Sequence, residues 1–285
     1  MSPEALSHHR HSLAHLLAAA VLELYPDSKR TIGPAVDDGF YYDFKFSTPI
    51  SEEDLPKIEA KMRELLPTFT SFDRSEVSAD EARAAFADNK YKTELINEFS
   101  SEGQTLSLYR SGTYVDLCRG GHAESLSGMD PESFRLDTIA GAYWRGSEKN
   151  DQLTRIYGLA FETKDELVAY QAMMEEAKKR DHRKLGKELE LFTVIDEIGG
   201  GLPLFYPRGA VLRRLVENFI IDRQEARGYV PIWIPHITKG RLYEISGHLQ
   251  KYDAMYPPML LKDEDAYYLK PMNCPHFMML YKQNP

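Results

Sequence analysis

The sequence is poor in cysteine and has no long hydrophobic run. Its two cysteines, Cys118 and Cys274, lie in unrelated contexts within 285 residues, so we expect free thiols and a reducing, cytoplasmic location. No segment approaches the ~18 apolar residues of a membrane span, so we expect no membrane partner. Residues 1–20 carry histidines and a helical pattern where a secretion signal has charged and apolar regions, and no signal peptide is predicted.

An excess of positive charge is also absent. The 44 acidic residues outnumber the 35 basic ones, and the formal net charge is −9. This balance argues against a surface that binds nucleic acid throughout, although a local basic patch is still possible. With 42% hydrophobic residues, the chain can bury one large core or two medium ones. Composition alone therefore does not identify the function, and the sequence motifs must be used.

A pair of histidines occurs near the N-terminus, in a segment with helical periodicity. Ser2-Pro3-Glu4 is a helix-start pattern, and apolar residues recur at helical spacing until Pro26. His11 and His15 lie one turn apart on this helix and face the same way. Such a pair occurs on ordinary helix surfaces and also in metal or catalytic sites, so the pair alone does not decide between them.

A second pair, Cys118 and His122, follows a predicted hairpin of residues 105–109 and 113–117. Loops at strand ends carry chemistry on a rigid base. The loop reads Asp116-Leu117-Cys118-Arg119-Gly120-Gly121-His122. Its glycines let the backbone approach a ligand, and its acid and arginine bracket the cysteine with opposite charges. A cysteine alone could be a small buried side chain, but the whole loop indicates a site. We expect the two pairs to meet in one pocket.

The remaining patterns predict an α+β fold, with a mostly antiparallel sheet and packed helices in the first part of the chain. Further strands are expected at residues 31–36, 40–46, 134–139, 142–145 and 153–160. A helix from residue 163 leads into the basic run of residues 178–187, which is either a solvated helix face or a phosphate contact. We therefore divide the chain into a first domain (1–162), a linker helix (163–187) and a second domain (188–285).

The second domain has a different pattern. A long helix is expected over residues 208–227, with Gly228 as its stop. A strand is expected over residues 230–234. The chain reaches Pro285 just after the start of another helix, and this domain has no obvious finish.

Several segments of the first domain together resemble the editing domain of bacterial threonyl-tRNA synthetase. They are His11-x-x-x-His15, Gly39-Phe40-Tyr41-Tyr42-Asp43, Tyr91-Lys92, the loop 116–122 and Ala140-Gly141-Ala142-Tyr143-Trp144-Arg145-Gly146. In the second domain, the long helix and residues 228–235 resemble class II motif 1, which builds the dimer interface in that family. The segment Lys270-Pro271-Met272-Asn273-Cys274-Pro275 resembles the one whose cysteine is a ligand of the amino-acid-recognising zinc.

This resemblance implies a threonine–tRNA ligase that uses ATP and magnesium, binds threonine and threonine tRNA, and forms a homodimer. Class II motifs 2 and 3 are missing from the sequence, and the other zinc ligands are expected beyond residue 285. The second domain is therefore expected to be the truncated beginning of a class II antiparallel-sheet domain. Of the implied sites, only the editing site has all of its parts.

The implied editing reaction hydrolyses serine that is wrongly esterified to threonine tRNA. A pocket discriminates one methyl group by only ~1–3 kcal/mol, so a second, hydrolytic site is useful. The resemblance gives catalytic roles to His11, His15, Lys92, Asp116, Cys118 and His122, and substrate binding to Tyr41, Tyr42, Arg119, Gly120 and Gly121. His11 and His15 would position the ribose and ester, and Lys92 and Asp116 would orient the amino acid and water. Cys118 and His122 would complete the side of the pocket that activates the water. The identity of the base stays open.

Three alternatives also stay open. Related alanyl editing domains hold zinc with the same two pairs, whereas the threonyl family is thought to work without a metal; the four side chains are competent zinc ligands in either case. The chain could instead be a stand-alone trans-editing hydrolase, with residues 186–285 as a docking appendage. It could also be a non-catalytic module for tRNA binding or dimerisation.

Overall fold

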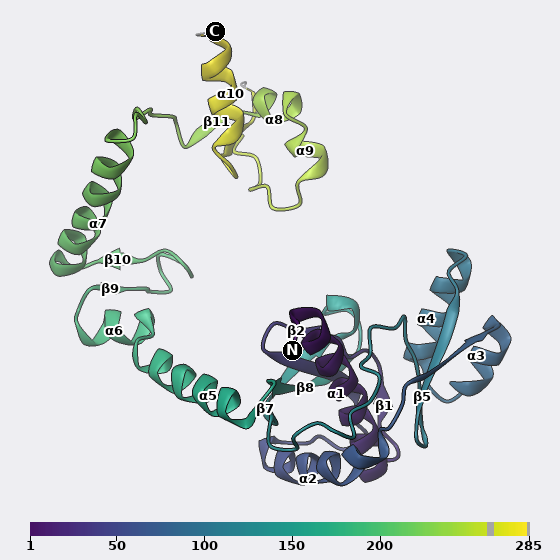
Figure 1. Ribbon diagram of the computed structural model, residues 1–285. Helices are drawn as coiled ribbons and strands as arrows, with labels where there is room; N and C mark the ends of the chain where they lie inside the picture. The colour runs from purple at the N-terminus through teal and green to yellow at the C-terminus, as the bar shows by residue number, and fades with distance from the viewer. Residues whose placement is uncertain (261–264, 284–285) are drawn as a thin grey trace. The chain divides into compact units, whose positions relative to one another are not determined.

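The computed structural model describes residues 1–260 and 265–283. The chain forms two compact units, Met1–Asp181 and His182–Pro285 (Figure 1). Every strand pair among the described residues is antiparallel, and helices pack against the sheets. The predicted α+β class with antiparallel sheets is confirmed. No helix in the described ranges is both long and apolar enough to cross a membrane.

The first unit is built on a five-stranded sheet with the order β1-β3-β8-β7, in which β2 also pairs with β3. Its strands are β1 (Lys29–Arg30), β2 (Ala35–Val36), β3 (Gly39–Lys45), β7 (Phe134–Tyr143) and β8 (Gln152–Ala160). The helices α1 (Pro3–Leu24) and α2 (Leu55–Leu65) pack together and contribute to one apolar core with this sheet. The short turns η1 (Glu52–Asp54) and η2 (Leu66–Thr68) flank α2.

Three of the expected strands differ in detail. The strand predicted over residues 31–36 is split into β1 and β2, because Gly33 and Pro34 interrupt the ladder. A Cβ atom at Gly33 would lie 2.0 Å from the Tyr42 ring, so this glycine lets the ring pack against the backbone. The strands predicted at 134–139 and 142–145 form the single strand β7, with a bulge between Leu136 and Thr138, which ends in the turn η3 (Trp144–Gly146).

A three-stranded sheet, β4-β5-β6, carries the second half of the predicted site. Its strands are β4 (Asp73–Val77), β5 (Leu106–Ser111) and β6 (Tyr114–Leu117), and α3 (Ala79–Ala85) and α4 (Lys90–Ser101) pack beside it. Ser78 and Glu81 form a capping box on α3. Asn89 caps α4 by accepting from the amides of Tyr91 and Lys92. The helix α5 (Lys164–Lys179) completes the first unit.

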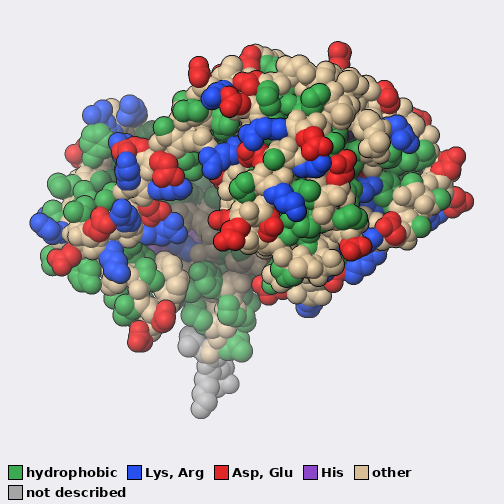
Figure 2. Space-filling view, turned by 90° about the horizontal axis from the view of Figure 1, so that it is seen from below, with side chains coloured by type: hydrophobic (Ala, Val, Ile, Leu, Met, Phe, Trp, Pro, Cys, Tyr) green, Lys and Arg blue, Asp and Glu red, His purple; other side chains and the backbone are tan. Residues whose placement is uncertain are grey.

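The second unit has two small two-stranded sheets, the long helix α7 and several shorter helices. Its elements are α6 (His182–Glu188), β9 (Phe192–Thr193), β10 (Leu204–Phe205), α7 (Pro207–Glu225), β11 (Ile237–Lys239), α8 (Gly240–Ile245), α9 (His248–Lys251), β12 (Tyr267–Leu269) and α10 (Cys274–Gln283). The strand predicted over 230–234 is wrong: Pro231 lacks an amide proton, and Val230 and Trp233 are 80% and 81% exposed. Hydrophobic side chains also lie at the surface around α7, at the left of Figure 2.

Candidate active site

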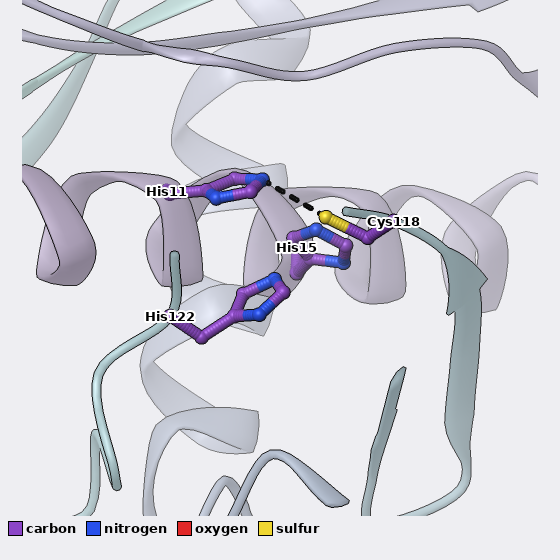
Figure 3. A group of neighbouring side chains, drawn as sticks. All are labelled: His11, His15, Cys118 and His122. Carbon is purple, nitrogen blue, oxygen red and sulfur yellow. Dashed lines mark hydrogen bonds between the residues drawn. The ribbon is translucent and has the colours of Figure 1, made fainter. Parts of the chain in front are cut away.

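The two predicted pairs meet in the first unit. His11 and His15 project from α1, and Cys118 and His122 come from the loop after β6 (Figure 3). One ligand atom from each of the four side chains lies within 4.8 Å of the others. His11 Nε2 is 3.5 Å from Cys118 Sγ, and the rings of His11 and His122 stack with centroids 4.5 Å apart.

Backbone contacts hold the loop against α1. The Ala123 amide donates to Ser12 Oγ at 2.9 Å, and His11 Nδ1 donates to the Gly121 carbonyl at 3.2 Å. Gly120 has φ 107°, a conformation that favours glycine, and a Cβ atom there would lie 2.7 Å from the Tyr109 hydroxyl. The glycine of the motif is thus required by the backbone path, and that path brings the loop to the histidines.

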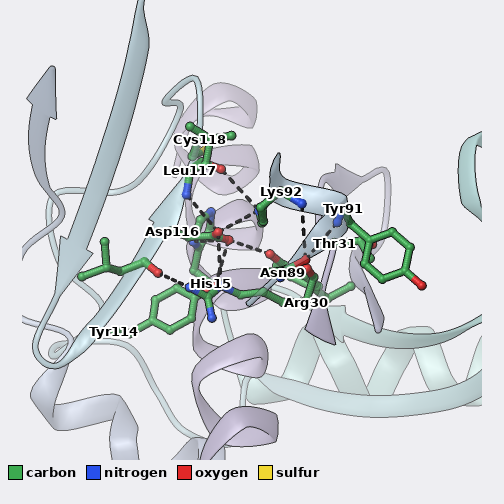
Figure 4. A network of polar contacts seen from close by, with 12 residues as sticks. His15, Arg30, Thr31, Asn89, Tyr91, Lys92, Tyr114, Asp116, Leu117 and Cys118 are labelled. Atoms are coloured by element: carbon green, nitrogen blue, oxygen red, sulfur yellow. Dashed lines mark hydrogen bonds and ion pairs between the residues drawn. The ribbon is translucent and has the colours of Figure 1, made fainter. Parts of the chain in front are cut away.

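Asp116 is the centre of a buried polar network (Figure 4). Its side chain is 1% exposed, and five groups donate to a carboxylate that offers about four lone-pair sites. The donors to Oδ1 are Lys92 Nζ (2.7 Å), Arg30 Nε (3.3 Å) and the Leu117 amide (2.9 Å), and those to Oδ2 are the hydroxyls of Tyr42 (2.5 Å) and Tyr114 (2.9 Å). The carboxylate is saturated. It orients Lys92 and has no free lone pair with which to activate water.

The charge state of Asp116 follows from these partners. Burial by itself would raise the pKa of its carboxyl, but the charges of Lys92 and Arg30 outweigh burial and hold the pKa well below its usual range. Burial lowers the pKa of Lys92, and Asp116 opposes that shift. We take this close pair as ionised, because the short contact to Asp116 stabilises both charges. His15 Nδ1 lies 3.8 Å from the same carboxylate, but burial keeps its pKa well below 6.5, so its ring is neutral.

The other site groups are also uncharged at neutral pH. Burial lowers the pKa of His11, and it lowers the pKa of His122 to about 3. Both ring nitrogens of His122 are buried without a hydrogen-bond partner among the described residues. A neutral imidazole has one nitrogen that can take up a proton, accept a hydrogen bond from a hydroxyl or bind a metal. Burial also raises the pKa of Cys118 to about 11, so this side chain is a thiol and a poor nucleophile.

A cavity of about 600 Å³ opens beside the network. That volume is within the range of small-molecule sites. Its lining includes His11, His15, Tyr42, Lys92, Asp116, Cys118, Arg119, Gly120 and Gly121. His122 lines an adjoining cavity of about 820 Å³, and His8 borders both cavities. The structure thus brings all but two of the predicted editing-site residues, Tyr41 and His122, to one cavity. The ring of His122 stacks on that of His11, which lines the cavity.

Tyr41 lies away from both cavities. Successive side chains of a strand point to opposite faces, so Tyr41 lies on the other face of β3 from Tyr42. It packs against Tyr157, with ring centroids 5.6 Å apart, and against the Arg155 guanidinium at 3.8 Å. Its predicted role in substrate binding is not supported by this placement.

Three residues that position the site were missed by the sequence analysis: Arg30, Asn89 and Tyr114. Arg30 and Tyr114 donate to Asp116, and the Asn89 side chain donates to the Arg30 carbonyl at 2.8 Å. No local pattern marks Arg30, because its partner Asp116 lies 86 residues away on another element, whereas Tyr114 lies two residues before Asp116 on β6. A helix-cap pattern could have found Asn89, since asparagine is a preferred capping residue.

The four clustered side chains have the donor chemistry of a zinc site. Histidine nitrogens and a cysteine sulfur are preferred zinc ligands, and the unpartnered nitrogens of His122 leave room for such a bond. The thiol of Cys118 would lose its proton on binding. Cys274, the other predicted ligand, is exposed at the start of α10. Among the described residues, it belongs to no group of three or more potential ligands.

Comparisons with known proteins cover the whole chain. No family model matches it. The threonine–tRNA ligase of Rubrobacter xylanophilus is 52% identical over 286 residues, which cover 100% of this chain and 44% of that protein. The threonine–tRNA ligase of Borreliella burgdorferi is 49% identical over 273 residues, covering 95% of this chain and 47% of that protein. The chain therefore spans less than half the length of these relatives.

One solved structure is also similar in sequence. It is the RNA binding domain of threonyl-tRNA synthetase from Cryptosporidium parvum, 33% identical, with a TM-score of 0.34, over 37% of this chain and 26% of that one. The relatives are ligases that act on an amino acid and tRNA. This chain is a homologue of the threonine–tRNA ligases along its whole length. The resemblance of the sequence to threonyl-tRNA synthetases is confirmed at the level of the family.

Proposed function

We propose that the first unit is an editing hydrolase that cleaves the ester of seryl-tRNA made on threonine tRNA. The observation that carries this proposal is the composition of the 600 Å³ cavity. The cavity combines the neutral imidazoles of His11 and His15 with the buried ammonium of Lys92. This ammonium pairs with the carboxylate of Asp116, whose lone pairs are all used. Such a set can accept a proton from water and stabilise a developing oxyanion, the two needs of ester hydrolysis.

His11 is the best-placed base. Its Nδ1 donates to the Gly121 carbonyl, so the unprotonated Nε2 faces Cys118 at the cavity. In the proposed reaction, a water oxygen attacks the ester carbonyl carbon while His11 Nε2 takes a water proton. The tetrahedral intermediate then expels the ribose oxygen, which recovers that proton. The products are serine and the free tRNA end.

Lys92 is the group that we assign to the oxyanion. Within the described part of the chain, its Nζ has two acceptors, Asp116 Oδ1 at 2.7 Å and the Leu117 carbonyl at 3.5 Å. An ammonium has three donors, so one is left for the substrate. A donor fixed before the reaction costs no reorganisation when charge develops.

The experiment measures deacylation of seryl-tRNA for threonine by the chain. We expect His11→Ala and Cys118→Ala each to lower the rate by roughly a hundredfold or more, because the first removes the base and the second removes a side chain that positions the attacking water. His9→Ala, on the same helix but outside the cavity, and Cys274→Ala are the matched controls. Full turnover in both site variants would exclude this pocket as the active site. Assays with a chelator and with added zinc decide whether the four ligands act with a metal.

We further propose that the chain represents part of a cytoplasmic homodimeric ligase that uses threonine, ATP with magnesium, and zinc. Its homology to the threonine–tRNA ligases supports this. In this proposal, Cys274 supplies one zinc ligand and α7 the dimer contact. Because the chain spans less than half of those relatives, we expect it to catalyse no ATP–pyrophosphate exchange by itself, and robust exchange would contradict this.

A further inference from the structure

Two cations share one buried carboxylate beside the cavity. Lys92 Nζ is 2.7 Å and Arg30 Nε is 3.3 Å from the same oxygen of Asp116, Oδ1. The donors on Oδ2 are the neutral hydroxyls of Tyr42 and Tyr114. One negative charge therefore faces two positive charges. Lys92 is at the cavity lining, whereas Arg30 is not.

Arg30 is held in this place by several independent contacts. Its guanidinium lies 5.0 Å from the Phe86 ring and 5.4 Å from the Tyr114 ring. Its Nη2 donates to the Val115 carbonyl at 2.8 Å, and its side chain is 18% exposed. A cation packed between aromatic rings and bonded to backbone does not exchange freely with solvent. The positive charge of Arg30 is therefore fixed in place next to Asp116.

The backbone of Arg30 is tied to the helix that carries Lys92. The Asn89 side chain donates to the Arg30 carbonyl at 2.8 Å, and its oxygen accepts from the amide of Lys92 at 3.3 Å. The same asparagine caps α4. Arg30 therefore fixes both the start of that helix and the carboxylate to which Lys92 is bonded.

We propose that Arg30 is a positioning residue that compensates Asp116, so that Lys92 presents a surplus positive charge to the cavity and the cavity takes up an anionic group. With Lys92 and Asp116 alone, the two charges would cancel at a distance. With Arg30, a net charge of one is left in a site of low dielectric, where its field is strong. The anion is the oxyanion of an ester or the carboxylate of a released amino acid. The catalytic consequence rests on the proposed hydrolase, whereas the charge itself does not.

The charge is measured first by alkylating Cys118, which lines the cavity. The probes are iodoacetate, an anion, and iodoacetamide, which is neutral; in both, the sulfur displaces iodide. The ratio of the two rates cancels changes in thiol pKa and access. We use a Cys274→Ser background and expect Arg30→Met to lower the iodoacetate-to-iodoacetamide ratio about tenfold. Arg30→Lys should keep most of the original ratio.

Arg155→Met is the matched control. Arg155 is also a paired, half-buried arginine on an aromatic ring, but it bonds Asp43 beside Tyr41, away from the cavity. Its removal should leave the ratio unchanged. Arg30→Gln, which retains a donor without the charge, is the second variant if Arg30→Met does not fold. An unchanged ratio in either folded variant would overturn the proposal.

Deacylation kinetics give the second readout. On seryl-tRNA, Arg30→Met should lower kcat about tenfold and change KM by less than about threefold, since most of the binding energy of a tRNA comes from its phosphate contacts. Arg30→Lys should recover kcat. If the unsubstituted chain has no deacylase activity, the proposed function fails, but the alkylation ratio still tests Arg30. A fall in the ratio with unchanged kcat would refute its part in catalysis.

Discussion

Two helices of similar length show how the two units differ. In the first unit, α1 buries a continuous run from Ser12 to Val21. In the second, the apolar residues of α7, such as Leu215 and Phe219, are 59% and 56% exposed. Both segments have a helical apolar pattern in the sequence. The pattern predicts that the apolar face of each helix will pack against something, but a core and a site form only where another part of the chain covers that face. The first unit supplies that partner itself.

The largest expected effect is on the core of the first unit. Phe40 is fully buried, so Phe40→Ala should cost about 3–5 kcal/mol of the free energy of unfolding through lost burial and a cavity. Phe219→Ala, the same change on α7, should alter it by less than about 0.5 kcal/mol. Urea unfolding of each unit measures both. Equal losses would mean that α7 is covered in solution.

The second effect concerns charge pairs. Asp116→Ala would leave Lys92 and Arg30 buried without their carboxylate, and we expect a loss of about 3–5 kcal/mol. Glu217→Ala removes an ion pair with Arg213 on α7, in which both side chains are more than half exposed. Such pairs contribute little, so no measurable change is expected. Thermal unfolding of the two variants, side by side, decides. A mild phenotype for Asp116→Ala would show that water reaches the two cations.

The site was predictable where its signals are local. The helix carrying His11 and His15 has its cap and spacing in the sequence, and the loop at Cys118 has its glycines. Arg30 was missed because its role depends on Asp116, which lies 86 residues away. Tyr114 lies two residues before Asp116 on the same strand, and strand alternation could have placed both side chains on one face. Strand alternation could have separated Tyr42 from Tyr41, since only one of two neighbours can face the core.

The lack of a covering partner in the second unit also explains why residues 230–234 do not form the predicted strand. Its β-branched residues favour a strand, but a strand exists only with a neighbour to bond to, and Pro231 removes a donor. No neighbour pairs with it in the described ranges. The homology could be read from motifs in both units, whereas tertiary contacts decided which of the motif residues lie together.

A smaller effect should appear in the pH dependence of stability. Burial lowers the pKa of His11, His15 and His122 in the folded first unit. In the unfolded chain these rings titrate near 6.5, so the unfolded state binds more protons below that pH. Stability should therefore be full above about pH 7 and fall as the pH drops from 6.5 toward 5, by on the order of 1 kcal/mol per histidine.

Urea midpoints of the first unit at several pH values between 7.5 and 5 measure this loss. Above pH 5 the carboxylates are still ionised, so their titration does not confuse the result. His122→Gln should flatten the dependence, whereas His248→Gln in the second unit should not. A midpoint that does not change with pH would mean that folding does not lower the pKa of these rings.

The smallest change in stability is expected from a charge on the exposed face of α7. Leu215→Glu alters a residue that is 59% exposed, so the free energy of unfolding of the monomer should change by less than about 0.5 kcal/mol. Self-association through this face should nevertheless be lost, because burying a charge in an apolar contact is unfavourable. Sedimentation at several concentrations measures it. Val168→Glu, on α5 and 53% exposed, is the control and should leave the sedimentation behaviour unchanged. If the chain sediments as a monomer before any substitution, α7 is not covered by a second copy, and the proposal that α7 supplies the dimer contact fails for this chain.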